Sequence, residues 1–386
     1  MSDDDDRAEV IIIGGGIVGA GAACEISKFA RVLILEAEDT CGYHATGRSV
    51  ASFTENYGTG VIRRLAMASR DFLTAPPEGF VEAPILGPRG MITVARADQK
   101  DLIDFELDRA RALVPSIHAL TVDEAIARVP VLRRDYLAHA IFEPHSMDVD
   151  VHLLHQGYLR AARSRGARVL TSAAVTGLVR IGDDWQVETR KGTFRAPRVV
   201  NAAGAWADRV ADLAGVRRLG LQPLRRTVFN IPAPENSAAW PLINDVGEEF
   251  FFKPLSGQIM VSPADATPSD PMDAWADEMD IAIAAERLER ATTITVQRVT
   301  HSWGGLRTFA PDGSPVAGEA PDAPGFFWLA GQGGYGIKTS PALSAAIAAL
   351  VRGAALPETL QAQGISADDL TPARFLVPAL TDEERP

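Results

Sequence analysis

Three glycines and one carboxylate near the N-terminus have the spacing of a dinucleotide-binding turn. Gly14, Gly16 and Gly19 fit G-x-G-x-x-G directly after the β-branched run Val10–Ile13, and an apolar run that predicts a helix follows. The first glycine permits a tight turn, the second lets the backbone approach a pyrophosphate, and the third lets helix and strand pack closely. Glu36 ends the next apolar strand, where an acid accepts hydrogen bonds from a ribose 2′-hydroxyl. The pattern predicts dinucleotide binding, and a βαβ unit that binds nothing is the alternative.

The same carboxylate disfavours an NADP 2′-phosphate but does not separate NAD from FAD. An N-terminal motif in a chain of 386 residues is usual where FAD is held by several later segments. Two later segments fit that arrangement: Val199–Trp206 is a strand running into small residues, and Phe326–Ile337 is an apolar strand with four glycines. Lys338-Thr339-Ser340 then opens a helix, and the N–H groups and dipole at its start would stabilise negative charge on a flavin.

The composition restricts the class of protein. A chain of 386 residues suits two domains, and 46% hydrophobic with 23% charged residues is an ordinary globular balance. A net charge of −12 with scattered Lys and Arg argues against binding to nucleic acid or to an anionic membrane surface. Apolar runs such as Pro341–Val351 are too short to span a bilayer, and the acidic start Asp3–Asp6 is the opposite of a signal peptide. We therefore expect a cytoplasmic protein with a solvated acidic tail and no transmembrane segment.

Cysteine and histidine usage predicts neither disulfides nor a metal site. The chain has 2 cysteines, too few for a disulfide framework, and Cys24 falls in the predicted first helix as a small buried side chain. His152 and His155 share one predicted helix face, but no cluster of acids or cysteines accompanies them in the sequence.

The nucleotide-binding elements are dispersed along the chain, which predicts a discontinuous domain. We expect a helix at Asp148–Arg165 capped by Asp150, a second sheet from the alternating runs within Pro223–Pro263, and an amphipathic helix at Pro341–Arg352. The expected class is α/β (α+β overall), with a Rossmann-like FAD-binding domain of the glutathione-reductase type and an antiparallel-sheet substrate domain. We assign residues 1–86, 143–218 and 304–386 (including a C-terminal tail) to the FAD-binding domain, and residues 87–142 and 219–303 to the substrate domain.

Several motifs together resemble the FAD-dependent D-amino-acid oxidase superfamily, which includes glycine oxidase and sarcosine oxidase. They are the N-terminal glycine motif, Val199–Trp206, PDGSPVAG at Pro311–Gly318 and GQGGYGI at Gly331–Ile337. Within that superfamily the match is closer to the bacterial D-arginine dehydrogenase type. The segments similar to that type span nearly the whole chain: HATGRS (His44–Ser49), VPVLRRD (Val129–Asp135), LHQGYLR (Leu154–Arg160), LAGVRRLGLQPLRR (Leu213–Arg226), THSWGGLRTF (Thr300–Phe309) and GQGGYGIKTS (Gly331–Ser340).

The resemblance implies a set of FAD contacts spread over the chain. Among them, Arg48 and Ser49 are donors suited to a diphosphate or to the edge of the ring. No cysteine lies near the C-terminal glycine loop, so we expect non-covalent FAD rather than the covalent link of sarcosine oxidases. The implied contacts are Gly14, Gly16, Val18, Gly19, Glu36, Ala37, Ala45, Thr46, Gly47, Arg48, Ser49, Val50, Ala51, Val175 through its backbone, Ala203, Gly204, Gly333, Gly334, Tyr335, Gly336, Ile337 and Lys338.

The resemblance also implies residues that bind an amino-acid substrate. Arg226 and Arg307 occupy positions that clamp the substrate carboxylate, and planar bidentate pairing by arginine is the strongest way to hold such a group. Tyr57 matches a tyrosine on a mobile loop that closes over the substrate. Gly334 matches a backbone carbonyl that orients the substrate amine.

Three departures from the D-arginine dehydrogenase type bear on specificity. The stretch Gly87–Met91 carries no acid, although that type has one there to pair with the substrate guanidinium, while Ser52 replaces an active-site histidine and Phe251 a tyrosine. Losing the acid removes a charge-assisted contact of about 1.5–3 kcal/mol. Together with Leu242 and Met91, Phe251 indicates a more apolar pocket. We therefore expect neutral or hydrophobic D-amino acids rather than strictly D-arginine.

The expected reaction is oxidative deamination. Hydride passes from the substrate Cα to flavin N5, and the imino acid hydrolyses to a 2-keto acid and ammonia. No side chain is required as a strong base, because a substrate with a neutral amine can lose hydride directly. The alternatives are an oxidase or dehydrogenase of N-methyl or other secondary amino acids on the same fold, a non-redox FAD-binding protein, and an NAD-dependent enzyme. The electron acceptor, oxygen or a quinone-like molecule, stays open.

Overall fold

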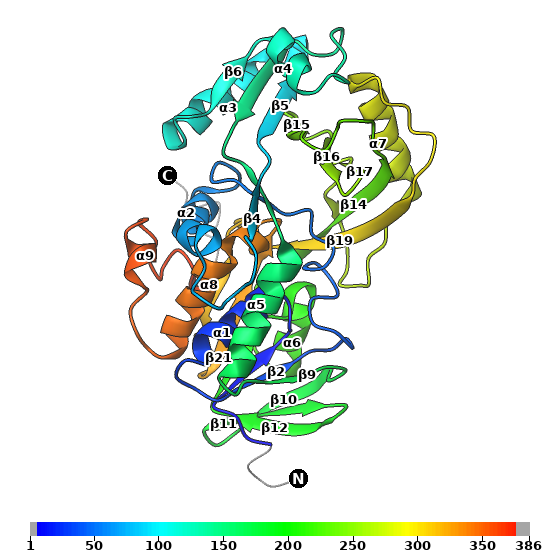
Figure 1. The fold of residues 1–386 in the computed structure, drawn as a ribbon. Coiled ribbons are helices and arrows are strands. Elements are labelled where there is room, and N and C mark those ends of the chain that lie inside the picture. Colours follow the sequence, from blue (N-terminus) through cyan, green and yellow to red (C-terminus); the bar gives the residue numbers. More distant parts are fainter. Residues whose placement is uncertain (1–5, 376–386) are drawn as a thin grey trace, which may run out of the picture.

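The computed structural model describes residues 6–375, so the predicted acidic tail before Asp6 and the last part of the predicted C-terminal tail lie outside the described residues. A lower body in Figure 1 contains a six-stranded, mostly parallel sheet, and an upper body contains a ten-stranded, mostly antiparallel sheet. The long strands β14 (Gln222–Pro232) and β19 (His301–Phe309) pair near one end of the ten-stranded sheet and connect the bodies. The predicted mixed α/β class is confirmed.

The six-stranded sheet is built from short, almost wholly apolar runs. The strands Val10–Ile13 (VIII) and Val32–Leu35 (VLIL) are buried at every position, because other elements cover both faces of the sheet. All neighbours in this sheet are parallel except the β20–β21 pair. The strand order is β20 (Val316–Glu319), β21 (Phe326–Ala330), β13 (Arg198–Asn201), β1 (Val10–Ile13), β2 (Val32–Leu35) and β9 (Arg168–Leu170).

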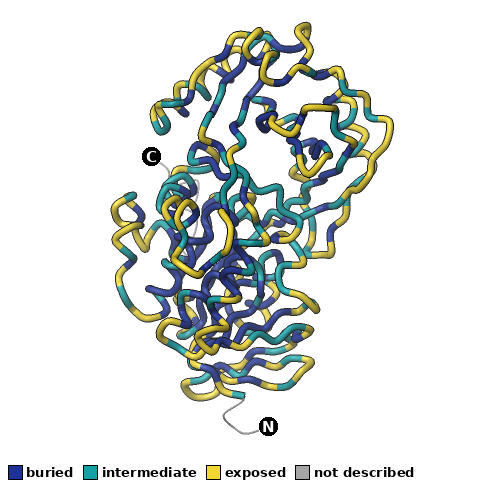
Figure 2. The backbone as a smooth tube through the Cα atoms, in the orientation of Figure 1, coloured by how far each residue is buried: buried dark blue, intermediate teal, exposed yellow. Residues whose placement is uncertain are grey.

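Four helices pack together on one side of the six-stranded sheet, and Figure 2 shows this region as the largest buried part of the chain. Cys24 is buried in the first of them, as predicted. A small sheet of three strands and a short helix pack on the other side, around Trp185 and Phe194. The four helices are α1 (Ile17–Ile26), α2 (Gly60–Thr74), α5 (Val151–Ser164) and α8 (Gly336–Val351). The elements on the other side are β10 (Val175–Ile181), β11 (Asp184–Thr189), β12 (Gly192–Ala196) and α6 (Ala207–Leu213).

Two helix predictions need correction. The helix predicted from Asp148 begins at Val151, because Met147–Val149 is a strand, β8, that pairs with β3 (Ser52–Phe53) and β4 (Leu86–Pro88). The predicted N-cap is present, since the Asp150 carboxylate accepts a hydrogen bond of 2.8 Å from the Leu153 N–H.

The C-terminal helix, predicted as amphipathic from Pro341, is α8, which begins at Gly336 and is buried on nearly all sides. It packs between α1 and α2, so it has no broad solvent face. Pro341 lies inside it and cannot donate to the Ile337 carbonyl, but the Ser340 hydroxyl donates to that oxygen at 2.9 Å. The helix therefore tolerates the proline.

The ten-stranded sheet carries the upper body and has one parallel pair, β5 with β15. In order it contains β22 (Gln332–Gly333), β19, β14, β17 (Gln258–Ser262), β16 (Phe251–Leu255), β15 (Leu242–Asp245), β5 (Met91–Ala95), β7 (His139–Glu143) and β6 (His118–Leu120), with β18 (Thr267–Pro268) beside β14. Its helices are α3 (Lys100–Leu113), α4 (Val122–Arg128) and α7 (Glu278–Ala291), and the short α9 (Glu358–Gln361) belongs to the lower body. The predicted domain boundaries stay a prediction.

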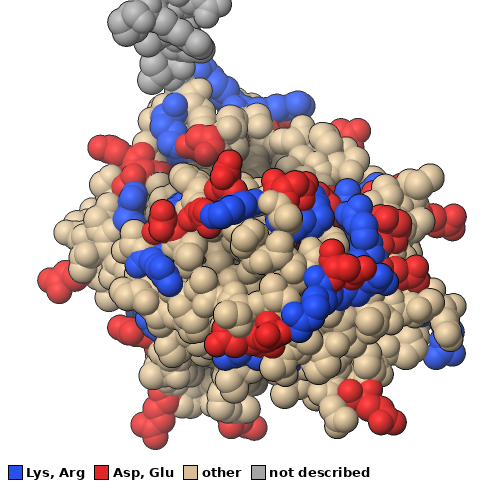
Figure 3. All heavy atoms as spheres, turned by 90° about the horizontal axis from the view of Figure 1, so that it is seen from above, with Lys and Arg blue, Asp and Glu red and all other residues tan. Residues whose placement is uncertain are grey.

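Charged side chains of both signs are mixed on the face shown in Figure 3, where acidic and basic groups are interspersed rather than gathered by sign. Between residues 6 and 375 no helix is long and apolar enough to cross a membrane. In the same range no group of three or more His, Cys, Asp or Glu is placed to hold a metal ion.

Candidate functional site

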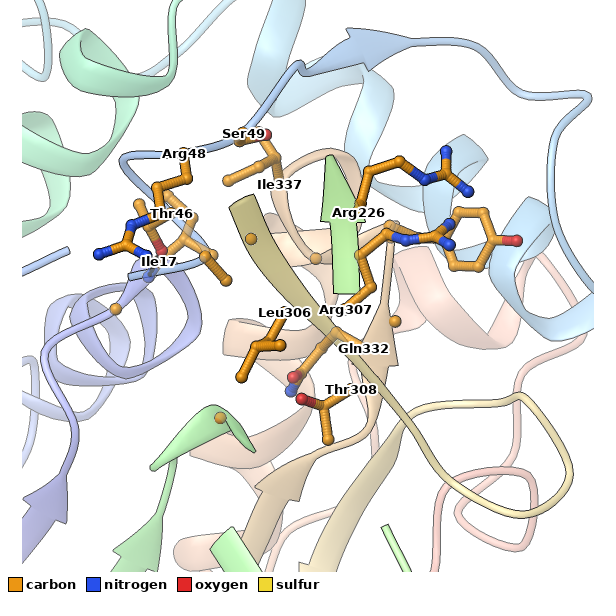
Figure 4. A pocket seen from close by; sticks show the side chains of 18 of the residues that line it. Ile17, Thr46, Arg48, Ser49, Arg226, Leu306, Arg307, Thr308, Gln332 and Ile337 are labelled. Atoms are coloured by element: carbon orange, nitrogen blue, oxygen red, sulfur yellow. Dashed lines mark hydrogen bonds between the residues drawn. The ribbon is translucent and has the colours of Figure 1, made fainter. Parts of the chain in front are cut away.

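A cavity of about 950 Å³ extends from the carboxyl ends of β1 and β2 to the ten-stranded sheet. In open α/β sheets this edge is where ligands bind. Figure 4 shows its two ends, with Ile17 and Thr46 at one and the guanidinium groups of Arg226 and Arg307 side by side at the other. Ile337 lies between the two ends. The cavity is thus long enough to join two chemically different sites.

The backbone at the nucleotide end requires two of the three motif glycines. Gly14 has a φ of 103°, and a Cβ there would lie 2.5 Å from the Ala202 carbonyl oxygen. A Cβ on Gly19 would lie 2.0 Å from the Gly14 carbonyl oxygen, so α1 packs directly on the turn. Gly16 has room for a Cβ, because the nearest atom, Thr46 Oγ1, would be 3.4 Å away. Glycine at that position therefore keeps the cavity wall open rather than relieving a clash within the protein.

Glu36 lies at the carboxyl end of β2 and lines the cavity. Its Oε2 accepts a hydrogen bond of 2.7 Å from the Gly15 N–H, and its Oε1 accepts one of 2.9 Å from the Glu38 N–H. These bonds hold the carboxylate beside the glycine turn. The Ile17 N–H donates to Thr46 Oγ1 at 3.0 Å, which ties the loop after β2 to the start of α1. A ribose contact by Glu36 stays a prediction.

The Arg48 side chain points away from the arginine pair in Figure 4. Its guanidinium donates to the Ala274 and Gly304 carbonyl oxygens and pairs with the Asp273 carboxylate. Its own carbonyl accepts a hydrogen bond of 3.0 Å from the Trp303 indole N–H. Arg48 therefore joins the loop to β19 and to the segment around Ala274, and its guanidinium already has protein partners.

The C-terminal glycine loop passes close to β19 before α8 begins. A Cβ on Gly333 would lie 2.4 Å from the Phe309 ring, and one on Gly334 would lie 3.1 Å from Arg307 Cδ. Gly336 starts α8 and lines the cavity. The first N–H groups of a helix have no acceptor within the helix, so α8 presents free donors and the positive end of its dipole there.

Arg226 on β14 and Arg307 on β19 form the other end of the cavity. The Asp265 carbonyl accepts hydrogen bonds from both, at 2.6 Å from Arg226 and 3.2 Å from Arg307, and the Ala264 carbonyl accepts a second one from Arg226 at 2.9 Å. Arg226 lies 3.9 Å from the Asp265 carboxylate, and Arg307 makes no ion pair with a residue in the described part of the chain. Backbone carbonyls, rather than carboxylates, therefore orient both side chains.

This arrangement leaves positive charge poorly compensated. Burial, with the neighbouring Arg307 cation, lowers the pKa of Arg226 to about 10. Arg307 Nε is buried without a hydrogen-bond acceptor among the described residues. A carboxylate bound across the two guanidinium groups would satisfy free N–H donors and relieve the repulsion. The pair thus has the properties of a carboxylate-binding site.

Aromatic side chains form the walls near the arginine pair. The Tyr57 and Tyr335 ring centroids are 5.2 Å apart, and the Tyr57 hydroxyl donates to Glu248 Oε1 at 3.2 Å. Burial raises the pKa of Tyr57, so the hydroxyl stays protonated as a donor. Phe251 also lines this end, and Ser52 Oγ is buried without a described partner.

Within the stretch Gly87–Met91, only Met91 lines the cavity. Arg89 instead pairs with the Asp148 carboxylate at 2.6 Å and donates to the Trp240 carbonyl at 2.9 Å. Met91 lies next to Leu242 on paired strands, and both line the cavity. Met91 and Leu242 thus form an apolar patch, next to the polar side chains of Thr93 and Asn244 on the same strands.

Nearly all residues predicted from the sequence line this cavity. Every predicted catalytic residue does so, and every predicted cofactor contact except Gly19, which packs on the turn, and Gly47, whose N–H donates to the Gly42 carbonyl at 2.7 Å. The structure therefore brings together residues from both ends of the chain. Their individual roles stay predictions.

Sequence reasoning missed three residues of the site. Glu248 lies in the turn after β15 with a φ of 55°, Asp265 acts through its backbone carbonyl, and Glu143 ends β7. None belongs to a motif. Only the strand register could have indicated Glu143, because it lies opposite Met91 on the neighbouring strand.

The glycine turn lies at the carboxyl edge of a parallel sheet, and a second sheet lies across the shared cavity. These features define a class of two-domain dinucleotide-binding proteins. The chain matches the model of the FAD dependent oxidoreductase family (DAO) over residues 9–350, and it belongs to that family. The predicted superfamily and the predicted FAD cofactor are confirmed. The choice between NAD and FAD is thereby settled in favour of FAD.

Individual relatives extend over most of the chain. It is 27% identical to the glycine oxidase of Geobacillus kaustophilus (strain HTA426) over 355 residues, 89% of this chain and 93% of that protein. It is 25% identical to the mitochondrial sarcosine dehydrogenase of Homo sapiens over 344 residues, 83% of this chain but 37% of that much longer protein. The crystal structure of L-proline dehydrogenase from P. horikoshii has a TM-score of 0.84 and covers 97% of this chain and 100% of that one, at 19% identity, which shows a shared fold.

Proposed function

We propose that this protein catalyses FAD-dependent oxidative deamination of D-amino acids with neutral or hydrophobic side chains. The observation that carries the proposal is the buried pair Arg226 and Arg307, oriented by carbonyl oxygens in the same cavity as the glycine turn. An amino acid supplies the carboxylate that this pair lacks. Relatives named as glycine oxidase and sarcosine dehydrogenase support an amino-acid substrate. The D configuration rests on the resemblance of the motifs to the D-arginine dehydrogenase type.

The residues around the cavity suit FAD. Glu36 and the start of α1 would hold the ADP half, and the free N–H groups at the start of α8 would face the flavin ring. No cysteine in the described part of the chain lines the cavity, so a cysteinyl link to the flavin has no residue from which to form. When bound, FAD supplies the two-electron acceptor for the hydrogen removed from the substrate.

The protein's own groups bind and orient the substrate. Arg226 and Arg307 hold the carboxylate, and the Gly334 carbonyl, adjacent to Arg307, accepts a hydrogen bond from the amine. With both its carboxylate and its amine held, the substrate presents its Cα in a defined orientation. Tyr57 and its loop exclude water. The neutral amine donates its electron pair as the Cα–H bond breaks, and the imino acid then hydrolyses to a 2-keto acid and ammonia. No side-chain base is needed.

Side-chain specificity follows from the wall formed by Met91, Leu242 and Phe251. Burial against these three side chains favours apolar substrates, and the acid nearest Tyr57, Glu248, already accepts a hydrogen bond from the Tyr57 hydroxyl. We expect higher kcat/KM for D-leucine, D-methionine and D-phenylalanine than for D-arginine. A higher value for D-arginine contradicts this part of the proposal.

The test is anaerobic mixing of the holoenzyme with a panel of D- and L-amino acids while the visible flavin absorption band is followed. We expect bleaching by neutral D-amino acids, with ammonia and a 2-keto acid as products. Bleaching by L-amino acids alone overturns the stereochemical assignment. Reoxidation with oxygen or with a quinone, with hydrogen peroxide measured, then identifies the electron acceptor.

A second candidate, oxidation of N-methyl or other secondary amino acids, is favoured by the similarity to sarcosine dehydrogenase. The same arginine pair would hold that carboxylate. Formaldehyde from sarcosine-like compounds, in place of ammonia, selects this candidate. Yellow protein that no amine bleaches indicates a non-redox FAD-binding protein.

A further inference from the structure

The ammonium group of Lys338 is directed at a loop rather than at solvent. Lys338 lies in the first turn of α8 and is 4% exposed. Its Nζ donates to the Thr54 carbonyl at 2.8 Å and to the Tyr57 carbonyl at 2.7 Å. Both carbonyls belong to residues 54–59, the segment between β3 and α2, which we call the Tyr57 loop. One side chain thus holds two points of the loop that carries Tyr57.

The opposite side of the loop is held by the upper body. The Thr54 hydroxyl donates to Glu143 Oε1 at the end of β7 and accepts a hydrogen bond of 3.2 Å from the Asn56 N–H. The Asn56 amide donates to Glu106 on α3 at 3.2 Å. Thr54 therefore connects α8 in the lower body, through its carbonyl, to β7 in the upper body, through its hydroxyl.

The same ammonium group lies under the aromatic wall of the cavity. Lys338 Nζ is 5.7 Å from the Tyr57 ring centroid and 5.4 Å from the Tyr335 ring centroid. A cation at this distance from two ring faces is attracted to both. The far end of the Tyr57 side chain is fixed by its hydrogen bond to Glu248. Lys338 thus contacts both the backbone and the ring of Tyr57.

Burial of this charge is costly, because an ammonium group loses its hydration in the interior. Burial lowers the pKa of Lys338 to about 7, and the groups that act on it are Glu143 on β7, Glu55 in the loop and Arg63 on α2. Glu143 is itself buried, which raises its pKa to about 7, and its Oε2 has no described hydrogen-bond partner. A methionine would fill the same space without this cost. The two carbonyls of the loop replace part of the lost hydration and fix the position of the ammonium group.

We propose that Lys338 is a positioning residue that couples the first turn of α8, where the flavin is expected, to the conformation of the Tyr57 loop in which Tyr57 lines the cavity. The inference rests on the proposed function only in taking Tyr57 as a wall of the substrate site. Lys338 Nζ binds the loop rather than the arginine pair. It holds the Thr54 and Tyr57 carbonyls, and Glu143 holds the Thr54 hydroxyl, so that Tyr57 stays in the same cavity as the arginine pair.

The test is Lys338→Met in the FAD-loaded protein, with backbone hydrogen exchange of residues 54–59 as the first readout. We expect exchange in this loop to accelerate while FAD content is retained. With an amino acid that bleaches the flavin, we expect KM to rise about tenfold or more, because Lys338→Met removes two charge-assisted hydrogen bonds from the loop, with a much smaller change in kcat. Unchanged loop exchange and unchanged KM overturn the proposal, as does loss of FAD without faster loop exchange.

Further variants keep the test sharp. Thr54→Val removes the hydroxyl bound to Glu143 and leaves both Lys338 hydrogen bonds in place, so it should accelerate loop exchange less than the lysine variant does. If Lys338→Met does not fold, Lys338→Gln takes its place, because it stays polar but is too short to hold both carbonyls. Ser344→Ala is the matched control, because Ser344 is buried in α8 and its hydroxyl has no described partner. We expect it to leave loop exchange and KM unchanged. Loop exchange needs no substrate, so absence of bleaching by any amino acid refutes the proposed function without affecting this test.

Discussion

Replacing Arg307 with methionine separates the binding role of the arginine pair from any structural role. Arg307 makes one hydrogen bond of 3.2 Å to the Asp265 carbonyl, no described ion pair, and has a buried Nε without a partner. It also acts as a like charge on Arg226 and lowers its pKa. Methionine keeps much of the side-chain volume and removes the repulsion. Without substrate, the variant should therefore lose little stability.

The loss should appear when substrate binds. A hydrogen bond between charged groups contributes about 1.5–3 kcal/mol, so losing the contact to the substrate carboxylate lowers kcat/KM by about 10- to 150-fold. The loss should be larger than for substitutions on the apolar wall. Steady-state kinetics with a D-amino acid that bleaches the flavin measures kcat/KM, and thermal unfolding measures stability.

Arg225→Met is the matched control. Arg225 precedes Arg226 on β14, so its side chain points to the opposite face of the strand. It pairs there with Asp277 at 3.1 Å and with Asp280 at 3.0 Å. This variant should lower the melting temperature and leave kcat/KM nearly unchanged, the reverse of Arg307→Met. If Arg307→Met instead lowers the melting temperature strongly and keeps kcat/KM, the arginine pair is structural and our reasoning is refuted.

Three other outcomes test separate parts of the structure. Gly14→Ala should lower both FAD content and melting temperature, because Gly14 has a φ of 103° and a Cβ there would lie 2.5 Å from the Ala202 carbonyl oxygen. Gly60→Ala is the control and should keep both, since no atom would lie nearer than 3.7 Å to its Cβ. Flavin absorbance per protein measures the FAD content. Because the pKa of Arg226, although lowered by burial, stays at about 10, a simple aliphatic carboxylate should bind with one dissociation constant between about pH 7 and pH 9, and a dissociation constant that rises in this range contradicts the assignment. Between its ordinary pKa of 4.5 and about 7, folded Glu143 keeps a proton that the unfolded chain releases, so stability falls as the pH rises through this window. Glu143→Gln should therefore raise the melting temperature more at about pH 8 than at about pH 5, and an equal effect at both counts against it.

Local sequence was sufficient where one segment contains the whole physical reason. The glycines at 14 and 19 are required by contacts within the turn and with the neighbouring strand, and such contacts follow from the βαβ unit itself. The Asp150 cap was predictable for the same reason, since its partner Leu153 is three residues away. The start of its helix was not, because Met147–Val149 is drawn into a small sheet by strands distant in sequence.

The local sequence does not show which distant residues a long side chain binds. The Arg48 guanidinium binds the Asp273 and Ala274 region, more than two hundred residues away in sequence. The Lys338 ammonium binds two carbonyls of the Tyr57 loop. Both residues line the cavity, and their predicted FAD contacts stay predictions. A long side chain can reach several partners, and only the packed structure decides among them.

By itself the sequence determined the cofactor end of this protein: a glycine turn, an acid after the second strand, and a glycine loop before a helix, each a short segment whose backbone conformation limits what it can bind. Composition and motif order also determined the fold class. The motif resemblance pointed to Arg226 and Arg307 one at a time, but only the tertiary structure shows that these residues, 81 positions apart, are adjacent, buried and short of negative charge. The uncompensated charge of the arginine pair and the contacts that hold the Tyr57 loop both depend on distances between segments remote in sequence. These distances are set only when the two sheets pack together.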